Sequence, residues 1–153
     1  ETDTNELVQA ILNNFSLRIE ETGAKITHDK LPMIIADSSQ IQRLFINLIH
    51  NSMKFVPPDK VPEIHISCWE EKDSWGFSIK DNGIGIQDKF QDKIFVIFQR
   101  LHSVKEYPGT GIGLAICKRI TQRHQGKIWF ESEEGIGTTF FFTLKKHKFV
   151  NKS

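Results

Sequence analysis

This sequence of 153 residues lacks the features that mark several common functional classes. Its two cysteines, Cys68 and Cys117, have neither a metal-binding nor a redox spacing, and we expect free thiols in a reducing compartment. No apolar run approaches the roughly 18 residues of a membrane span, and no signal peptide is recognisable. The formal net charge of +1 indicates no preference for a polyanion. These absences predict a cytoplasmic protein, while a longer parent protein could still be anchored to a membrane.

The composition that is present fits one globular domain. Hydrophobic residues make up 39% of the chain and charged residues 25%, which are ordinary proportions for such a domain. At this length folding buries about 70% of the unfolded surface, enough for a proper core. The chain begins with Glu1 rather than methionine, which suggests a piece of a longer protein.

Apolar periodicity predicts an alternation of helices and strands. Helices are expected from Asp3 or Thr4 to about residue 21, from residue 38 to the Pro57–Pro58 pair, and from residue 110 to 124. Strands are expected at residues 24–28, 63–70, 77–81, 127–132 and 138–144, the second and third forming a hairpin. A short helical piece is expected at residues 90–98, followed by a loop at 100–109.

The turn Asp81–Ile86 places an acid and two glycines directly after a predicted strand. A carboxylate in this position can accept a hydrogen bond from an amino group on a base. Gly83 and Gly85 allow the backbone to come close to a flat ligand. Taken alone, the same residues also fit an ordinary tight turn.

Asn47, Asn51 and Lys54 follow one another at spacings of four and three, so they share one side of the second helix. The oxygen of Asn51 is a ligand that Mg²⁺ accepts, and Lys54 offers a point charge for a phosphate. Alone, the two asparagines also fit solvated or core-bonded amides, and Lys54 also fits an exposed lysine.

The third predicted helix is opened by Gly109, Gly111 and Gly113. Unpaired N–H groups at such a helix start can converge on a phosphate. The pattern is not a dinucleotide-fold fingerprint, because no ribose-binding acid follows in a βαβ unit. It is not a Walker loop either, because the chain contains no Gly-Lys-Ser or Gly-Lys-Thr.

Five motifs therefore follow one another along the chain. They are Asn47–Phe55, Asp81–Ile86, Ile94–Arg100, Gly109–Ile116 and Gly135–Phe140. In this order they resemble the N box, first glycine box, F box, second glycine box and closing Gly-x-Gly-Thr-Thr-Phe of the catalytic ATP-binding domain of two-component sensor histidine kinases. The stretch from residue 98 to 111 is especially similar to phytochrome-type kinases.

This resemblance implies an α+β fold class and a division of the chain. The fold would be the two-layer Bergerat or GHKL sandwich, a mixed, mostly antiparallel five-stranded sheet with three helices on one face. Residues 1–5 would be the remnant of an upstream linker or dimerisation helix, residues 6–146 the catalytic domain, and residues 147–153 a disordered tail. A flexible ATP lid would span about residues 87–110.

The resemblance also implies ATP and Mg²⁺ as cofactors and a role for each motif. Asp81 would accept from the adenine amino group, supported through water by Thr139, and Asn51 would bind Mg²⁺. Asn47, Lys54 and Arg100 would lie at the phosphates as catalytic residues. Further cofactor contacts would come from Gly83, Gly85, Ile86, Gly109, Thr110, Gly111, Ile112, Gly113 and Leu114.

Three departures from the family pattern stand out. Ser52 replaces the usual alanine, a small change, and Val96 replaces a usual acid, which questions any role for that acid. None of the six histidines has the context of a phosphoacceptor. The acceptor would therefore lie on a separate dimerisation hairpin of the same kinase, with a response regulator receiver domain downstream and no nucleic acid partner. The full-length protein would be a homodimer and this fragment a monomer.

Three functions are compatible with these motifs. The first is ATP-dependent phosphotransfer to a histidine on the separate hairpin. The second is a non-catalytic nucleotide-binding module of the same fold that regulates a partner. The third is ATP hydrolysis, for which such folds use a glutamate four residues before the metal-binding asparagine. Asn47 occupies that position and cannot act as a base.

Overall fold

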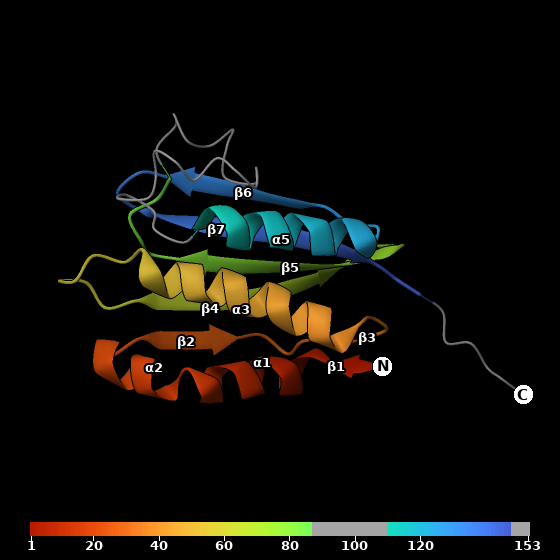
Figure 1. The fold of residues 1–153 in the computed structure, drawn as a ribbon, viewed down its shortest axis with the longest axis horizontal. Coiled ribbons are helices and arrows are strands. Elements are labelled where there is room, and N and C mark those ends of the chain that lie inside the picture. Colours follow the sequence, from red (N-terminus) through yellow and green to blue (C-terminus); the bar gives the residue numbers. More distant parts are fainter. Residues whose placement is uncertain (87–109, 148–153) are drawn as a thin grey trace, which may run out of the picture.

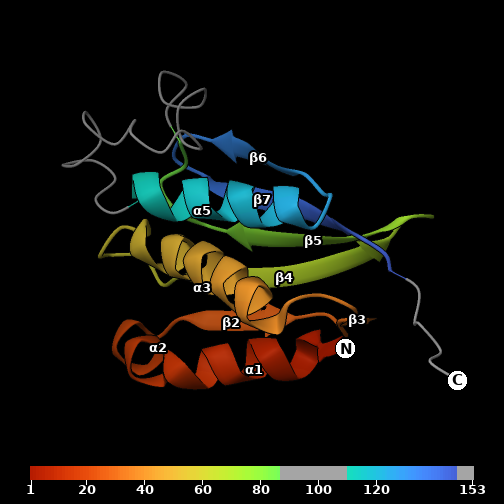
Figure 2. The same ribbon diagram turned by 45° about the vertical axis from the view of Figure 1, so that its right-hand side comes forward.

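The computed structural model describes residues 1–86 and 110–147, and Figures 1 and 2 show how its elements are arranged. In the first half, β1 (Thr2–Asp3), α1 (Thr4–Asn14), α2 (Ser16–Thr22), β2 (Lys25–His28), β3 (Met33–Ile34) and α3 (Ser38–Lys54) follow in order. The hairpin β4 (Glu63–Glu70) and β5 (Ser74–Asp81) comes next. The chain closes with α5 (Thr110–Arg123), β6 (Ile128–Glu133) and β7 (Gly137–Lys145).

The main sheet has five strands in the order β2-β4-β5-β7-β6. The pair β2 and β4 is parallel and the other three pairs are antiparallel. The expected mixed, mostly antiparallel sheet is thus confirmed. Since β5 and β7 are neighbours, residues far apart in the sequence meet at the sheet's centre, with Lys80 opposite Thr139.

The helices cover one face of this sheet, where α5, α3 and the α1–α2 pair lie side by side (Figures 1 and 2). The middle helix α3 is capped at its N-terminus by Asp37, whose carboxylate accepts hydrogen bonds from the N–H groups of Ser39 and Gln40 at 3.1 and 3.2 Å. Its apolar side packs on the sheet, where the rings of Phe45, Phe77 and Phe142 meet with centroids 5.1–5.5 Å apart. This aromatic contact joins the helix layer to β5 and β7.

The predicted helix over residues 4–21 is divided in the structure. It is interrupted at Phe15, whose N–H bonds back to Ile11 and Leu12 and whose φ and ψ of −93° and 8° leave the helical range. Asn13 and Asn14, which have low helix propensity, precede the break. The Phe15 ring then stacks on His50 of α3. The first of the three expected helices is therefore divided into α1 and α2, and α3 and α5 correspond to the other two.

The first residues pack as part of the domain. Thr2–Asp3 pairs antiparallel with Met33–Ile34, and Thr2 and Thr4 are buried. Asn5 donates to the Leu31 carbonyl at 2.6 Å and accepts from its N–H at 2.7 Å. At the other end, Lys146 binds Glu70 at 2.6 Å. The helical piece, loop and lid expected between residues 87 and 109, and most of the expected tail, lie outside the described residues.

Among the described residues, no helix is both long and apolar enough to cross a membrane.

Candidate functional site

Asp81 ends β5 on the helix-covered face of the sheet. It follows the buried Phe77 and Ile79 in alternation, so its carboxylate points to the same side as the core. The N–H groups of Gly83 and Thr138 donate to its Oδ1 at 2.9 and 3.1 Å. Both bonds use the same oxygen, which leaves Oδ2 with acceptor capacity for a further donor.

The surroundings of Asp81 change its acidity. Burial raises the pKa of its carboxyl above the ordinary value of 3.8 because the charged form loses hydration. The N–H groups of Gly83 and Thr138, the hydroxyl of Ser52 and the charge of Lys60 act in the opposite direction and lower this pKa. The carboxylate is thus held in a partly dry place in which a hydrogen bond from a ligand is stronger than in water.

Two glycines bring the Asp81 turn close to neighbouring backbone. A Cβ on Gly83 would lie 2.7 Å from the Phe55 carbonyl oxygen, at the end of α3. Gly85 has a φ of 76°, and a Cβ there would lie 2.4 Å from the Glu133 carbonyl oxygen. Both glycines were expected from the sequence. They join the turn to α3 on one side and to the end of β6 on the other.

Asn51 lies on the inner side of α3, next to the Asp81 end of the sheet. It is only 8% exposed, and its Nδ2 is buried with no hydrogen-bond partner in the part of the chain that the structure describes. An unpaired buried amide costs roughly 1–3 kcal/mol. Such a group is well suited to bind a ligand, and the amide also offers the oxygen that Mg²⁺ accepts. The residues present therefore fit a magnesium–nucleotide site.

Asn47 brings α3 into contact with the beginning of α5. A Cβ on Gly113 would lie 3.5 Å from Asn47 Oδ1, an ordinary contact distance. The predicted phosphate-binding asparagine and the predicted glycine-led helix start are thus neighbours in space. Lys54 is half-buried and lies 6.0 Å from the centre of the Phe55 ring.

Several of the predicted cofactor contacts lie outside the described residues or at their boundary. Arg100 and Gly109 lie outside the described residues. Thr110, Gly111 and Ile112 lie in the first turn of α5, as expected for a glycine-led helix. Ile86 and Leu114 are buried in the core, and the N–H of Ile86 donates to Ser132 Oγ at 2.7 Å.

The threonine that contacts Asp81 in the structure is Thr138, whereas the sequence had suggested Thr139. Thr138 is buried and alternates with Phe140 and Phe142, which face the helices, whereas Thr139 is half-buried at the alternating position. The Thr138 hydroxyl is 2.8 Å from that of Ser132. Strand alternation counted from the two phenylalanines would have selected Thr138 from the sequence alone. No comparable sequence pattern would have indicated Ser132 or the role of Ser52.

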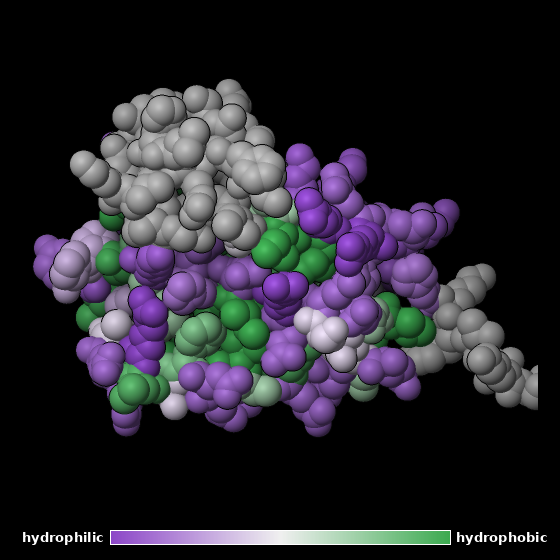
Figure 3. Space-filling view, viewed as in Figure 1, coloured by the Kyte–Doolittle hydropathy of each residue, from purple (hydrophilic) through white to green (hydrophobic). Residues whose placement is uncertain are grey.

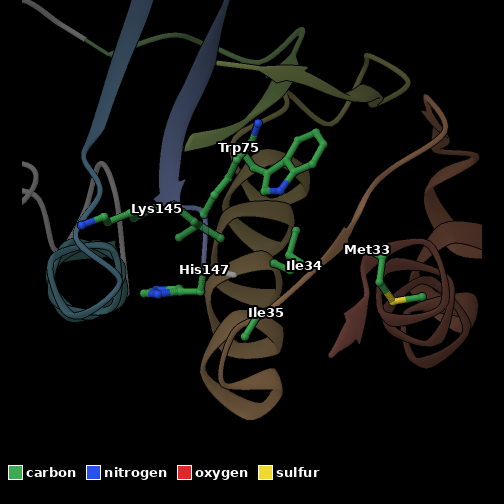
Figure 4. Close-up of a pocket in the computed structure, with 8 residues that line it drawn as sticks. Met33, Ile34, Ile35, Trp75, Lys145 and His147 are labelled. Carbon is green, nitrogen blue, oxygen red and sulfur yellow. The ribbon is translucent and has the colours of Figure 1, made fainter. Parts of the chain in front are cut away.

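A separate pocket lies at the opposite ends of β5 and β7, away from Asp81. It measures about 150 Å³ and is lined by apolar side chains, among them Ile34 and Trp75 (Figure 4), and by the consecutive residues Leu144, Lys145, Lys146 and His147. Lys146 Nζ lies 4.8 Å from the centre of the Trp75 ring. This pocket contains none of the predicted site residues.

Comparison with known families gives a match over residues 36–148 to the model described as "Histidine kinase-, DNA gyrase B-, and HSP90-like ATPase". This range holds the Asp81 turn, α3 and the start of α5.

Relatives of known description match nearly the whole chain. Cyanobacterial phytochrome A of Nostoc sp. is 52% identical over 94% of this chain and 19% of its own length. Phytochrome-like protein Cph1 of Synechocystis sp. is 50% identical over the same shares. The sensor protein RprX of Bacteroides fragilis is 37% identical over 94% of this chain and 29% of its own. The chain thus spans about a fifth of the length of the first two relatives.

Solved structures agree with these relatives. A nucleotide-free catalytic domain of histidine kinase ThkA has a TM-score of 0.80 and 27% identity, covering 95% of this chain and 93% of its own. The histidine kinase ThkA in complex with response regulator protein TrrA has a TM-score of 0.73 and 25% identity, covering 94% of this chain and 40% of its own.

Proposed function

Because the chain belongs to the histidine kinase-, DNA gyrase B- and HSP90-like ATPase family, we propose that it is the ATP-binding catalytic unit of a sensor histidine kinase. In this role it transfers the γ-phosphoryl of ATP to a histidine on a separate dimerisation hairpin. The observation that carries the proposal is the half-buried Asp81 carboxylate, with Oδ1 bound by Gly83 and Thr138 and Oδ2 able to accept. A response regulator would receive the phosphate afterwards.

The base would be bound at Asp81. The adenine amino group donates to Asp81 Oδ2, and the glycines of the turn let the ring lie close to the backbone. Thr138 takes the supporting place beside Asp81 that the sequence had given to Thr139. Because the carboxylate is partly dehydrated, this hydrogen bond discriminates strongly in favour of a base with an amino group.

The phosphates would be bound between α3 and the first turn of α5. Asn51 and Asn47 face this region, with Gly113 beside Asn47. Mg²⁺ would supply charge neutralisation for the phosphoryl oxygens, held by Asn51 and the phosphates themselves. In the described part of the chain, no three His, Cys, Asp or Glu side chains are grouped to hold a metal ion. The catalytic contribution of Asn47, Lys54 and Arg100 is to position and neutralise the transferring group.

The residue types present at the site disfavour the two other functions. An ATP hydrolase of this fold needs a base four residues before Asn51, and Asn47 occupies that position. A purely regulatory module would be expected to have lost groups that bind the nucleotide. Asp81, Asn51, Asn47 and Lys54 are all present.

The test combines calorimetry with phosphotransfer. The chain binds Mg-ATP and labels a separately produced hairpin that carries the phosphoacceptor histidine. Asp81→Asn weakens ATP affinity about 100-fold, because its Nδ2 would face the adenine amino group donor to donor, while the fold is kept. Unchanged affinity in this variant overturns the assignment of Asp81. Binding without labelling of the hairpin favours the regulatory module, and rapid ATP turnover without an acceptor favours the hydrolase.

A further inference from the structure

Cys117 of α5 is a buried thiol to which the proposed function gives no role. In Figure 3 the outer surface of the helix layer is mainly hydrophilic where the described residues form it, and Cys117, which has no exposed surface, lies wholly inside. A fully buried thiol can form hydrogen bonds only with neighbouring protein groups. The partners of Cys117 therefore lie within the contact between α5 and α3.

The position of Cys117 in α5 places it on the same face of the helix as Gly113. The two residues are four positions apart, so their side-chain positions lie one above the other. Cys117 Sγ lies 3.9 Å from the Leu44 carbonyl oxygen of α3. Asn47 follows Leu44 by three positions on the same side of α3, and its Oδ1 would lie 3.5 Å from a Cβ on Gly113. Asn47 thus packs against the face of α5 that carries Gly113 and Cys117.

The hydrogen-bonding roles in this contact follow from the chemistry of the thiol and the amide. Burial raises the pKa of the Cys117 thiol to about 12, so the sulfur keeps its proton at neutral pH. Hydrogen bonds from its own backbone and from the Asn47 side chain act in the opposite direction and lower this pKa. A hydrogen bond that lowers the pKa of a thiol is donated to the sulfur, because it stabilises the thiolate. Asn47 therefore donates through Nδ2, its only side-chain donor, and the thiol proton is directed to the Leu44 carbonyl oxygen.

The two asparagines of α3 are consequently left with different groups for a ligand. The Nδ2 of Asn47 is held by the sulfur, and its Oδ1 lies at Gly113, where the phosphates would be bound. The Nδ2 of Asn51, about one turn further along α3, is buried without a hydrogen-bond partner among the described residues. An amide oxygen cannot donate to a phosphate oxygen, but it can bind Mg²⁺ or accept from a water that Mg²⁺ holds.

The arrangement of the three groups assigns a role to the sulfur. We propose that Cys117 is a positioning residue, which holds Nδ2 of Asn47 and so directs the amide oxygen of Asn47 toward the magnesium ion of bound Mg-ATP. The two ends of an amide have nearly the same shape, so an amide that loses the sulfur can turn over and present its nitrogen to the cation. Cys117 acts through Asn47 alone. This inference rests on the proposed function and adds a residue that sets its dependence on the metal.

The first test compares nucleotide binding with and without the metal. Calorimetry measures the affinity for ATP in Mg²⁺ and in EDTA, for the parent chain and for two variants of similar side-chain size. Cys117→Ala removes the sulfur and weakens the binding of Mg-ATP about fivefold, while the affinity for ATP in EDTA stays within about twofold. Cys117→Ser keeps a group that accepts from Asn47 and donates to Leu44, so its affinity for Mg-ATP stays within about twofold of the parent chain. Equal losses in the two variants, or in the two conditions, overturn the proposal.

The second test observes the amide of Asn47 in the chain without nucleotide. In NMR spectra the side-chain NH₂ protons of Asn47 resonate apart from those of the exposed Asn14, because one of them is directed to the sulfur. Cys117→Ala moves the Asn47 signals toward those of Asn14, whereas Cys117→Ser does not. Thr121→Val removes another buried polar group of α5, a hydroxyl that donates to the Lys118 carbonyl, and as the matched control leaves the Asn47 signals in place. Asn47 signals that are indifferent to Cys117→Ala contradict the proposal.

The two proposals fail in different ways, and a double-mutant cycle separates them. A parent chain that binds no Mg-ATP contradicts the proposed function itself. Where the parent chain binds Mg-ATP, Cys117→Ala causes no further loss of affinity in a chain that already carries Asn47→Ala, because the sulfur acts through that amide. A loss that is as large with Asn47→Ala as without it contradicts only the positioning role of Cys117.

Discussion

The two ends of the β5–β7 pair differ sharply although they belong to the same two strands. At one end Asp81 and Thr138 place polar groups on the helix-covered face, and the buried Nδ2 of the adjacent Asn51 has no hydrogen-bond partner among the described residues. At the other end Trp75 is paired with Leu144, and both apolar side chains border the pocket of Figure 4. Between them the rings of Phe77 and Phe142 stack.

This difference shows how binding and stability are separated along one pair of strands. Burying polar groups with incomplete hydrogen bonding lowers stability, and such sites are tolerated where a ligand completes them. Burying leucine and phenylalanine stabilises the fold by about 1.5–3 kcal/mol per side chain. Changes at the Leu144 end should therefore alter unfolding, and changes at the Asp81 end should alter nucleotide binding.

The largest effect is expected at the apolar end. Leu144 is 2% exposed, so Leu144→Ala should lower the free energy of unfolding by about 2–5 kcal/mol through lost burial and a new cavity. Denaturant unfolding measures this loss, and calorimetry at a temperature where the variant is folded should give an unchanged ATP affinity. Lys145→Ala, at the neighbouring exposed position, is the control and should change stability by less than about 0.5 kcal/mol. If folded Leu144→Ala bound ATP more weakly than the parent chain, the idea that one end of the strands serves stability and the other serves binding would be contradicted.

The sequence predicted the core and the Asp81 turn, but it did not predict the break in the first helix. The periodicity of α3 and the alternation of β4, β5 and β7 were sufficient to place the core, because each strand has only one face that can be buried. The position of Asp81, Gly83 and Gly85 followed from the turn that they form. The break at Phe15 could not be predicted, because it depends on stacking with His50, which is 35 positions away in the chain.

The supporting groups around Asp81 show a second limit. Thr138 and Thr139 are adjacent and identical, and the family motif led to Thr139, although the alternation with Phe140 would have selected Thr138. Ser132 comes from β6 and reaches Thr138 only because β6 and β7 are paired with Ser132 opposite Thr138. The contact between Asn47 and Gly113 likewise depends on how α3 and α5 pack. Such contacts arise from tertiary structure and leave no local pattern.

A smaller effect is expected from pH. Burial raises the pKa of Asp81 above 3.8, so the folded chain binds more protons than the unfolded chain between the two pKa values. The contribution of this group to stability is fully present below the unfolded pKa and is lost as pH rises through the folded pKa. The unfolding free energy of the parent chain, relative to that of Asp81→Asn, should therefore fall over this interval. ATP affinity should change in the opposite direction and weaken as pH falls through the raised pKa, since a protonated carboxyl no longer accepts at both oxygens. A difference between the two chains that is independent of pH would contradict this reasoning.

The smallest effect is expected at Ser52, whose hydroxyl lowers the pKa of Asp81 by hydrogen bonding and lies 3.0 Å from the Leu48 carbonyl oxygen. Its single proton can be donated to one of these two acceptors at a time. Ser52→Ala removes this support for the carboxylate, so the pKa of Asp81 should rise further, and ATP affinity should begin to weaken at a higher pH than in the parent chain. The loss of one hydrogen bond amounts to about 0.5–1.5 kcal/mol, so the affinity at neutral pH should change by less than about tenfold. An NMR titration of the Asp81 carboxyl carbon measures the pKa directly. Ser39→Ala, which removes a hydroxyl at the distant start of α3, is the matched control. If the pKa of Asp81 fell in Ser52→Ala, the serine would be acting through packing rather than as a donor to the carboxylate.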